Sequence, residues 1–188
     1  MKIKQTKKTI SEHIRKILIR WGFSKRGLFS NSKGEWYLLS QMFLIVLHLL
    51  SPYPKAEYIT FPINLFFIIS GIVISINGLI ISLKAFIDLG DNLTPLPYPI
   101  KESILIRNNS YKDSRHPLYK GLLLISLGIC IFTLSIIHLS LFITLSYLLK
   151  KKALKEEEQL KIKFPEYEDY MKEVPAIMKN IKYLDWRS

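Results

Sequence analysis

The chain has 188 residues, of which 49% are hydrophobic, and a formal net charge of +12 at pH 7. This length predicts one domain spanning residues 1–188. So large a positive charge is common in proteins that bind nucleic acid, but here the lysines and arginines flank long apolar blocks. That placement favours contact with anionic lipid and control of membrane topology, so we expect an integral membrane protein that binds no nucleic acid.

Residues 1–35 are expected to form a basic segment at the membrane surface. Between residues 9 and 21, apolar side chains recur at helical spacing and basic side chains occupy the opposite face. Thr9, followed three residues later by Glu12, has the form of a capping box. The pattern predicts an amphipathic helix that lies on the membrane, and a solvated helix docked on protein is the alternative.

Apolar runs predict four membrane spans within residues 36–156. The first runs from Trp36 to Tyr53, and the second runs from Phe61 to Leu89. The remaining run, from Gly121 to Leu149, would measure about 43 Å as one straight helix. Because the hydrocarbon core is only about 30 Å thick, two shorter spans fit this run better than one.

The most polar stretch of that run, from Thr133 to His138, predicts a tight turn. We expect two antiparallel helices, near residues 118–134 and 138–156, followed by a helical cytoplasmic tail over residues 157–188. The expected fold class is therefore all-α and integral to the membrane. It has about four transmembrane helices, of which the last two form a hairpin, and an N-terminal surface helix.

The distribution of basic residues supports four spans. Ten lysines and arginines precede the first span, one (Lys55) lies between the first two, five lie in residues 90–120, and ten follow from residue 150. Four spans keep the basic-rich segments on one side of the membrane, whereas three would carry the basic tail across. Both termini are therefore expected on the cytoplasmic or stromal side.

Residues 90–117 form a polar loop whose alternating prolines exclude a helix at 95–99. The loop leads into Ser114-Arg115-His116-Pro117-Leu118-Tyr119-Lys120-Gly121. Pro117 suits the first turn of a helix, and the free N–H groups of such a turn attract an anion such as a carboxylate, with Arg115 reinforcing the seat. The alternative is that Arg115 is an interfacial anchor and His116 a capping residue.

A second polar cluster, from Lys152 to Leu160, contains the acidic triplet at residues 156–158. If the last two spans form a hairpin, the triplet lies beside Arg115 and His116. An anion seat and a carboxylate then face one pocket, which suits the zwitterionic group of an amino acid. The alternative is a solvated helix held by i,i+4 ion pairs.

Aromatic residues follow this cluster at three-residue spacing: Phe164, Tyr167 and Tyr170. They either line an adenine-sized pocket or pack the tail onto the bundle. The four histidines lack the spacing of metal ligands, so no metal is expected.

Two motifs together resemble the isoprenylcysteine carboxyl methyltransferase and phospholipid methyltransferase superfamily. They are Arg115-His116-Pro117-x-Tyr119-x-Gly121 and Glu156-Glu157-x-x-Leu160-x-x-x-Phe164, followed by a Tyr…Val-Pro tail. The resemblance covers about residues 85–178 and implies a membrane enzyme that uses S-adenosylmethionine. By position, it implies cofactor contacts from Ser103, Ile104, Leu105, Ile106, Tyr111, His116, Pro117, Leu118, Tyr119 and Glu156.

We expect Arg115 and Glu157 to be catalytic. A carboxylate acceptor needs no base, whereas an amine or a hydroxyl would need one, and Glu157 is the nearest candidate. Lys152 stands where the family has a substrate-contacting arginine, and lysine lacks the bidentate fork for a carboxylate. This departure argues against a prenylcysteine acceptor. A second departure is Asn109-Ser110, which stands where the family often has Gly-Pro.

Because the expected cofactor site lies at the membrane surface, the acceptor is expected to be a membrane lipid or a lipophilic small molecule. Two other functions stay open. Sterol-type membrane reductases use NADPH and share an RHP-like turn and a similar aromatic tail, although Leu118 and the Glu156-Glu157 pair favour the methyltransferase. The other is a non-catalytic four-span protein with a basic surface helix.

Overall fold

The computed structural model describes residues 19–53 and 61–187, and over these ranges its regular structure is entirely helical. The expected all-α class is therefore confirmed. The amphipathic helix predicted over residues 9–21 falls mostly outside the described residues, as does Lys55. The α-helices are α2 (Lys25–Ser30), α3 (Glu35–Leu47), α4 (Ile63–Leu89), α5 (Pro117–Thr133), α6 (Ile136–Lys163) and α7 (Tyr167–Glu173), with short 3-10 turns η1 (Gly90–Asn92) and η2 (Asn109–Lys112).

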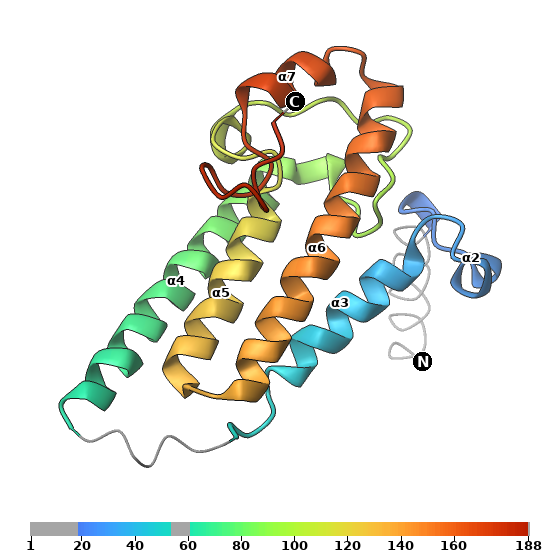
Figure 1. Ribbon diagram of the computed structural model, residues 1–188. Helices are drawn as coiled ribbons and strands as arrows, with labels where there is room; N and C mark the ends of the chain where they lie inside the picture. Colours follow the sequence, from blue (N-terminus) through green and yellow to red (C-terminus); the bar gives the residue numbers. More distant parts are fainter. Residues whose placement is uncertain (1–18, 54–60, 188) are drawn as a thin grey trace, which may run out of the picture.

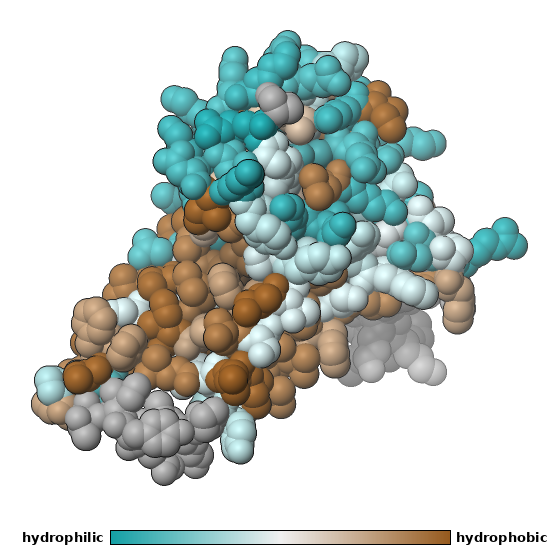
Figure 2. All heavy atoms as spheres, in the orientation of Figure 1, coloured by the Kyte–Doolittle hydropathy of each residue, from teal (hydrophilic) through white to brown (hydrophobic). Residues whose placement is uncertain are grey.

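The body of the molecule is a bundle in which α4 packs on α5, α5 on α6, and α6 on α3 (Figure 1). The loop after α4, together with α7 and the C-terminal segment, gathers at one end of this bundle. Figure 2 shows the consequence for the surface: hydrophobic residues cover the helical body, and hydrophilic residues cover the loop end. The molecule is therefore divided into an apolar body and a polar end.

Glycines allow α4 and α5 to approach each other closely. A Cβ added to Gly78 would lie 2.6 Å from the carbonyl oxygen of Gly121, and one added to Gly71 would lie 2.5 Å from that of Gly128. Both distances are far below van der Waals contact, so a larger residue would push the helices apart. Small residues such as Gly71 and Gly78 are what allows two apolar helices to pack backbone against backbone.

The turn predicted between Thr133 and His138 is confirmed, and it is only two residues long. Leu134 ends α5 in the left-handed conformation with φ 48°, and its N–H donates to the carbonyl oxygen of Cys130. Ser135 precedes α6, and its hydroxyl both donates to the carbonyl oxygen of Tyr53 and accepts from the N–H of Tyr53. The turn is therefore tied to the end of the α3 region.

Of the four predicted spans, the described residues contain one helix long and apolar enough to cross a membrane, Ile63–Asn92. Its most apolar stretch is only 11% buried, unlike the core helix of a soluble protein. α3 ends at Leu47 rather than Tyr53, because the chain turns at 48–50 before Pro52. At 1.5 Å per residue, α3 measures about 20 Å and α5 about 26 Å, so four spans stay a prediction.

Substitution of Gly78 by valine tests the α4–α5 contact. We expect it to destabilise the protein by about 1–3 kcal/mol, because the added side chain meets the α5 backbone, and to lower the midpoint of thermal unfolding in detergent. Val73→Leu is the matched control, since Val73 is 51% exposed on the same helix. Equal losses in the two variants would contradict the close packing.

Candidate functional site

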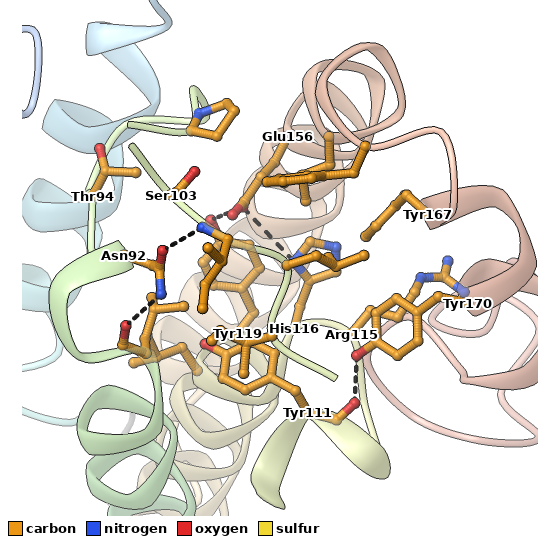
Figure 3. A pocket seen from close by; sticks show the side chains of 18 of the residues that line it. Asn92, Thr94, Ser103, Tyr111, Arg115, His116, Tyr119, Glu156, Tyr167 and Tyr170 are labelled. Carbon is orange, nitrogen blue, oxygen red and sulfur yellow. Dashed lines mark hydrogen bonds and ion pairs between the residues drawn. The ribbon is translucent and has the colours of Figure 1, made fainter. Parts of the chain in front are cut away.

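A cavity opens at the polar end of the bundle, between the start of α5, the middle of α6 and the loop that follows α4 (Figure 3). Its volume is about 160 Å³, whereas a single water needs only about 10–15 Å³. Every site residue expected from the sequence lines it, except Pro117 and Glu157. These lining residues are Ser103, Ile104, Leu105, Ile106, Tyr111, Arg115, His116, Leu118, Tyr119, Lys152 and Glu156.

The start of α5 is fixed by its own sequence and by the C-terminal segment. Pro117 occupies the first turn, as predicted, and His116 is the N-cap residue. The backbone N–H groups of Arg115 and His116 donate to the carbonyl oxygens of Pro175 and Ala176, each at 2.9 Å. These two bonds tie the residues just before α5 to the C-terminal segment, while the anion seat expected at the first turn itself stays a prediction.

Glu157 is the centre of a buried cluster next to the cavity, and Glu157 itself is only 2% exposed. Its Oε1 accepts from Nε of Arg115 at 2.7 Å and lies 3.0 Å from Nε2 of His116. Its Oε2 accepts from Nε1 of Trp186 at 2.6 Å, and the Tyr167 hydroxyl lies 3.4 Å from Oε1. One carboxylate therefore joins side chains from the start of α5, from α7 and from the C-terminal segment.

The environment of Glu157 keeps it ionised. Burial is the largest influence and raises the pKa of Glu157, but hydrogen bonds and charge from His116 and Arg115 together outweigh it and lower the pKa to about 2. Such a carboxylate is a poor proton acceptor near neutral pH. Catalysis by Glu157 stays a prediction, while its contacts favour a role in positioning Arg115 and His116.

Glu156, one residue earlier on α6, lines the cavity and remains partly accessible. Its side chain is 28% exposed, and its Oε2 accepts from the Tyr119 hydroxyl at 2.9 Å. The ring of Tyr119 stacks on that of His116, with centroids 5.3 Å apart and planes 5° from parallel. Tyr119 thus holds both a carboxylate and an imidazole at the cavity wall (Figure 3).

Arg115 and Glu156 bring opposite charges to the same cavity. Nη1 of Arg115 donates to the carbonyl oxygens of Met171 and Val174. Its Nη2 is buried and has no hydrogen-bond partner among the described residues. A buried, unpartnered guanidinium N–H is costly, so this atom is suited to an anionic group supplied by a ligand.

Lys152 lies on the side of the cavity that faces α3. Its Nζ donates to Oε1 of Gln41 at 2.7 Å and lies 5.3 Å from the centroid of the Tyr119 ring. Burial lowers the pKa of Lys152 to about 8, and the nearby Glu156 opposes this shift. Gln41 was missed in the sequence, although it is the only amide between Trp36 and Leu50.

Aromatic side chains form another wall of the cavity, which Tyr111, Phe164, Tyr167 and Tyr170 line. The Tyr170 hydroxyl donates to the carbonyl oxygen of Tyr111. The alternatives of lining a pocket and packing the tail both apply, because Tyr167 and Tyr170 also pack with Met171 in a small core. Burial raises the pKa of Tyr111 and of Tyr167, so both hydroxyls stay neutral.

Asn92 and Thr94 also line the cavity and were not expected from the sequence. Oδ1 of Asn92 accepts from the N–H of Ile104 at 2.8 Å, which holds the loop segment 103–106 against the end of α4. A single asparagine in a polar loop carries no distinguishing signal, and only the tertiary structure reveals this contact.

Comparison with models of known protein families finds no match for this chain, and comparison with curated proteins finds none either. Within residues 19–53 and 61–187, no group of three or more histidine, cysteine, aspartate or glutamate side chains could hold a metal ion. The function is therefore inferred from the chemistry of the cavity and from the two motifs that converge on it.

Substitution of Glu157 by glutamine tests the buried cluster. The folded-state pKa, about 2, lies below the ordinary 4.5. The stability from the ionised carboxylate is therefore fully present above about pH 4.5 and is lost as pH falls toward 2. Glu157→Gln removes it and strands the Arg115 charge, so we expect a loss of about 3–5 kcal/mol at neutral pH.

The measurement is unfolding of the detergent-solubilised protein across this pH range. Glu158→Gln is the control, because Glu158 is exposed on the same helical turn. We expect the control to behave as the wild type and the Glu157 variant to lose part of its acid dependence. Identical acid profiles for the wild type and Glu157→Gln would contradict the arrangement.

Proposed function

We propose that this protein is a membrane methyltransferase that uses S-adenosylmethionine to methylate a membrane lipid or a lipophilic small molecule. The observation that carries the proposal is the convergence of three distant segments on one cavity: residues 103–106, residues 115–119 and Glu156. These are the segments to which the family resemblance assigns the cofactor.

The charged groups of the cavity fit the amino acid part of S-adenosylmethionine. The unpartnered Nη2 of Arg115 suits its carboxylate, and the partly exposed carboxylate of Glu156 suits its ammonium group. The aromatic wall, which includes Tyr111 and Tyr170, offers faces for the adenine ring. A cation, an anion and an apolar wall in one cavity are the complement of this zwitterionic nucleoside.

S-adenosylmethionine supplies a methyl group that its sulfonium already activates. The residues of this chain therefore need to bind, orient and exclude water rather than to generate a reactive group. Glu157 fixes Arg115 and His116, and the Tyr119 hydroxyl fixes Glu156. Leucines line the cavity beside these polar groups and limit the entry of water: Leu89, Leu118 and Leu122.

Lys152 and Gln41 form the part of the site that we assign to the acceptor. The ammonium group of Lys152 has three N–H donors, and one of them is used by Gln41. The remaining donors suit an anionic or hydrogen-bond-accepting group. Because lysine offers no bidentate fork, a compact group fits better than the carboxylate of a prenylcysteine.

We place the protein in a membrane with four spans and with both termini on the cytoplasmic or stromal side. α3, α5 and the apolar part of α6, residues 136–149, lie in the same bundle as α4. Large apolar side chains on α3, α4 and α6 are exposed, among them those of Phe43, Ile80 and Ile143. The three segments placed on the cytoplasmic or stromal side hold ten, five and ten lysines and arginines, whereas the segment between the first two spans holds only Lys55, which supports this orientation.

An NADPH-dependent reductase fits the cavity less well. The phosphates of NADPH would meet the Glu156 carboxylate, which is partly exposed and faces the same space as Arg115. A phosphate beside this carboxylate would be repelled, and one N–H of Lys152 is already donated to Gln41. The reductase and a non-catalytic membrane protein are the two alternatives that the next experiment separates.

The purified protein, supplied with methyl-labelled S-adenosylmethionine and native membrane lipids, should transfer label to the organic phase. Glu156→Gln should reduce the transfer at least tenfold, because it removes the charge that faces the ammonium group. Glu158→Gln, an exposed neighbour, should leave transfer unchanged. Label in aqueous products alone, or consumption of NADPH instead, would refute the proposal.

The topology is tested by labelling single cysteines at Lys55 and Lys179 with a membrane-impermeant reagent, in a chain whose only cysteine, Cys130, is replaced by serine. Four spans place these two positions on opposite sides of the membrane. We therefore expect the reagent to reach Lys179→Cys from the cytoplasmic side and Lys55→Cys from the other side. Labelling of both from one side would exclude this topology.

A further inference from the structure

The C-terminal segment ends on the polar cluster of the candidate site. Nε1 of Trp186 donates to Oε2 of Glu157 at 2.6 Å, and the Trp186 ring centroid lies 6.5 Å from that of His116. Neither motif of the sequence includes Trp186, and it does not line the cavity. Its contact with the site is made through Glu157.

Trp186 is held in place by a closed loop. The N–H groups of Ile177 and Met178 donate to the carbonyl oxygen of Leu184 at 2.9 and 3.2 Å. Leu184 is buried in the main apolar core with Leu145 and Leu149 of α6. The chain therefore returns to α6 two residues before Trp186, which fixes where the indole begins.

A lysine on α6 also contacts aromatic rings of this segment. Nζ of Lys150 lies 3.9 Å from the centroid of the Tyr183 ring and 5.6 Å from that of the Trp186 ring. A cation over an aromatic face is attracted by the ring quadrupole. The indole is therefore fixed both by its N–H and by its ring.

The two oxygens of Glu157 have separate partners. Oε1 accepts from Arg115 and also contacts His116 and the Tyr167 hydroxyl, whereas Oε2 accepts from Trp186. Without the indole N–H, Oε2 of a buried carboxylate would lose its donor, and rotation to recover one would move Oε1 away from Arg115. The orientation of the Glu157 carboxylate thus depends on the indole of Trp186, while two backbone carbonyl oxygens also hold the guanidinium of Arg115.

We propose that Trp186 is a positioning residue of the ligand site: by orienting Glu157, it sets Arg115 and His116 to receive the amino acid part of S-adenosylmethionine. This inference rests on the proposed function. We assign the adenine part to the faces of Tyr111 and Tyr170, neither of which is hydrogen-bonded to Glu157, so the two parts of the ligand respond differently to the loss of the indole.

The test compares the affinities of S-adenosylhomocysteine and adenosine for the full chain in detergent. Trp186→Phe keeps the ring over Lys150 and removes the N–H. We expect it to weaken S-adenosylhomocysteine about tenfold, the effect of one hydrogen bond to a charged group, and to leave adenosine within about twofold. Trp36→Phe is the control, because Nε1 of the exposed Trp36 donates to the carbonyl oxygen of Leu28 instead.

A second measurement needs no ligand. In a Trp21→Phe/Trp36→Phe background, Trp186 is the only tryptophan, and its emission should shift when Glu157 is replaced by glutamine. Equal weakening of both ligands by Trp186→Phe, unchanged affinity for S-adenosylhomocysteine, or an unchanged emission would overturn the positioning role. If the wild type bound no S-adenosylhomocysteine, the proposed function would fall, and this inference with it.

Discussion

A carboxylate as deeply buried as that of Glu157 must be matched by donors, since an unpaired charge in the interior costs several kcal/mol. Its donors come from the turn before α5, from α7 and from the C-terminal segment, so these three parts of the chain must meet at α6 for the polar end to fold. The cavity lies beside this cluster, where Lys152, Glu156 and Leu160 of α6 line it. Helical geometry then turns Glu156 toward that space and Glu157 away from it.

The apolar body follows a different constraint, which is backbone proximity between α4 and α5. At Gly78 and Gly121, the two helices leave no room for a side chain, so their contact is set by shape rather than by charge. Large apolar residues of α4 lie exposed on its outer face, among them Phe66, Ile76 and Ile87. Paired charges hold the polar end together, and small residues allow the close packing of the body. α6 extends through both parts.

Features that depend on local rules could be predicted from the sequence. Pro117 marks the start of α5 because proline suits a first turn, and the polar stretch after Thr133 marks the hairpin because the run is too long for one span. The hairpin in turn explains why the acidic residues of α6 lie beside Arg115. The extent of α6 was underestimated, since its Lys and Glu residues continue the helix to Lys163 instead of ending it near residue 156.

Contacts between residues that are distant in sequence could not be predicted. Gln41 meets Lys152 across 111 positions, and no local pattern links an amide on one apolar run to a lysine at the end of another. The same holds for Trp186 and Glu157. The early end of α3 was also missed, because apolar composition continues to Leu50 while the backbone turns at His48.

α6 runs without a break from the apolar body into the polar end. The position of a residue along α6 therefore gives its distance from the apolar body. At 1.5 Å per residue, Lys152 stands about 5 Å beyond Leu149, where the long apolar run of the chain ends, and Glu156 stands about 6 Å farther. A ligand that contacts both Lys152 and Glu156 therefore has its polar group within about two helical turns of Leu149. Under the proposed function, an acceptor would thus be selected by the distance between its polar head and its apolar tail.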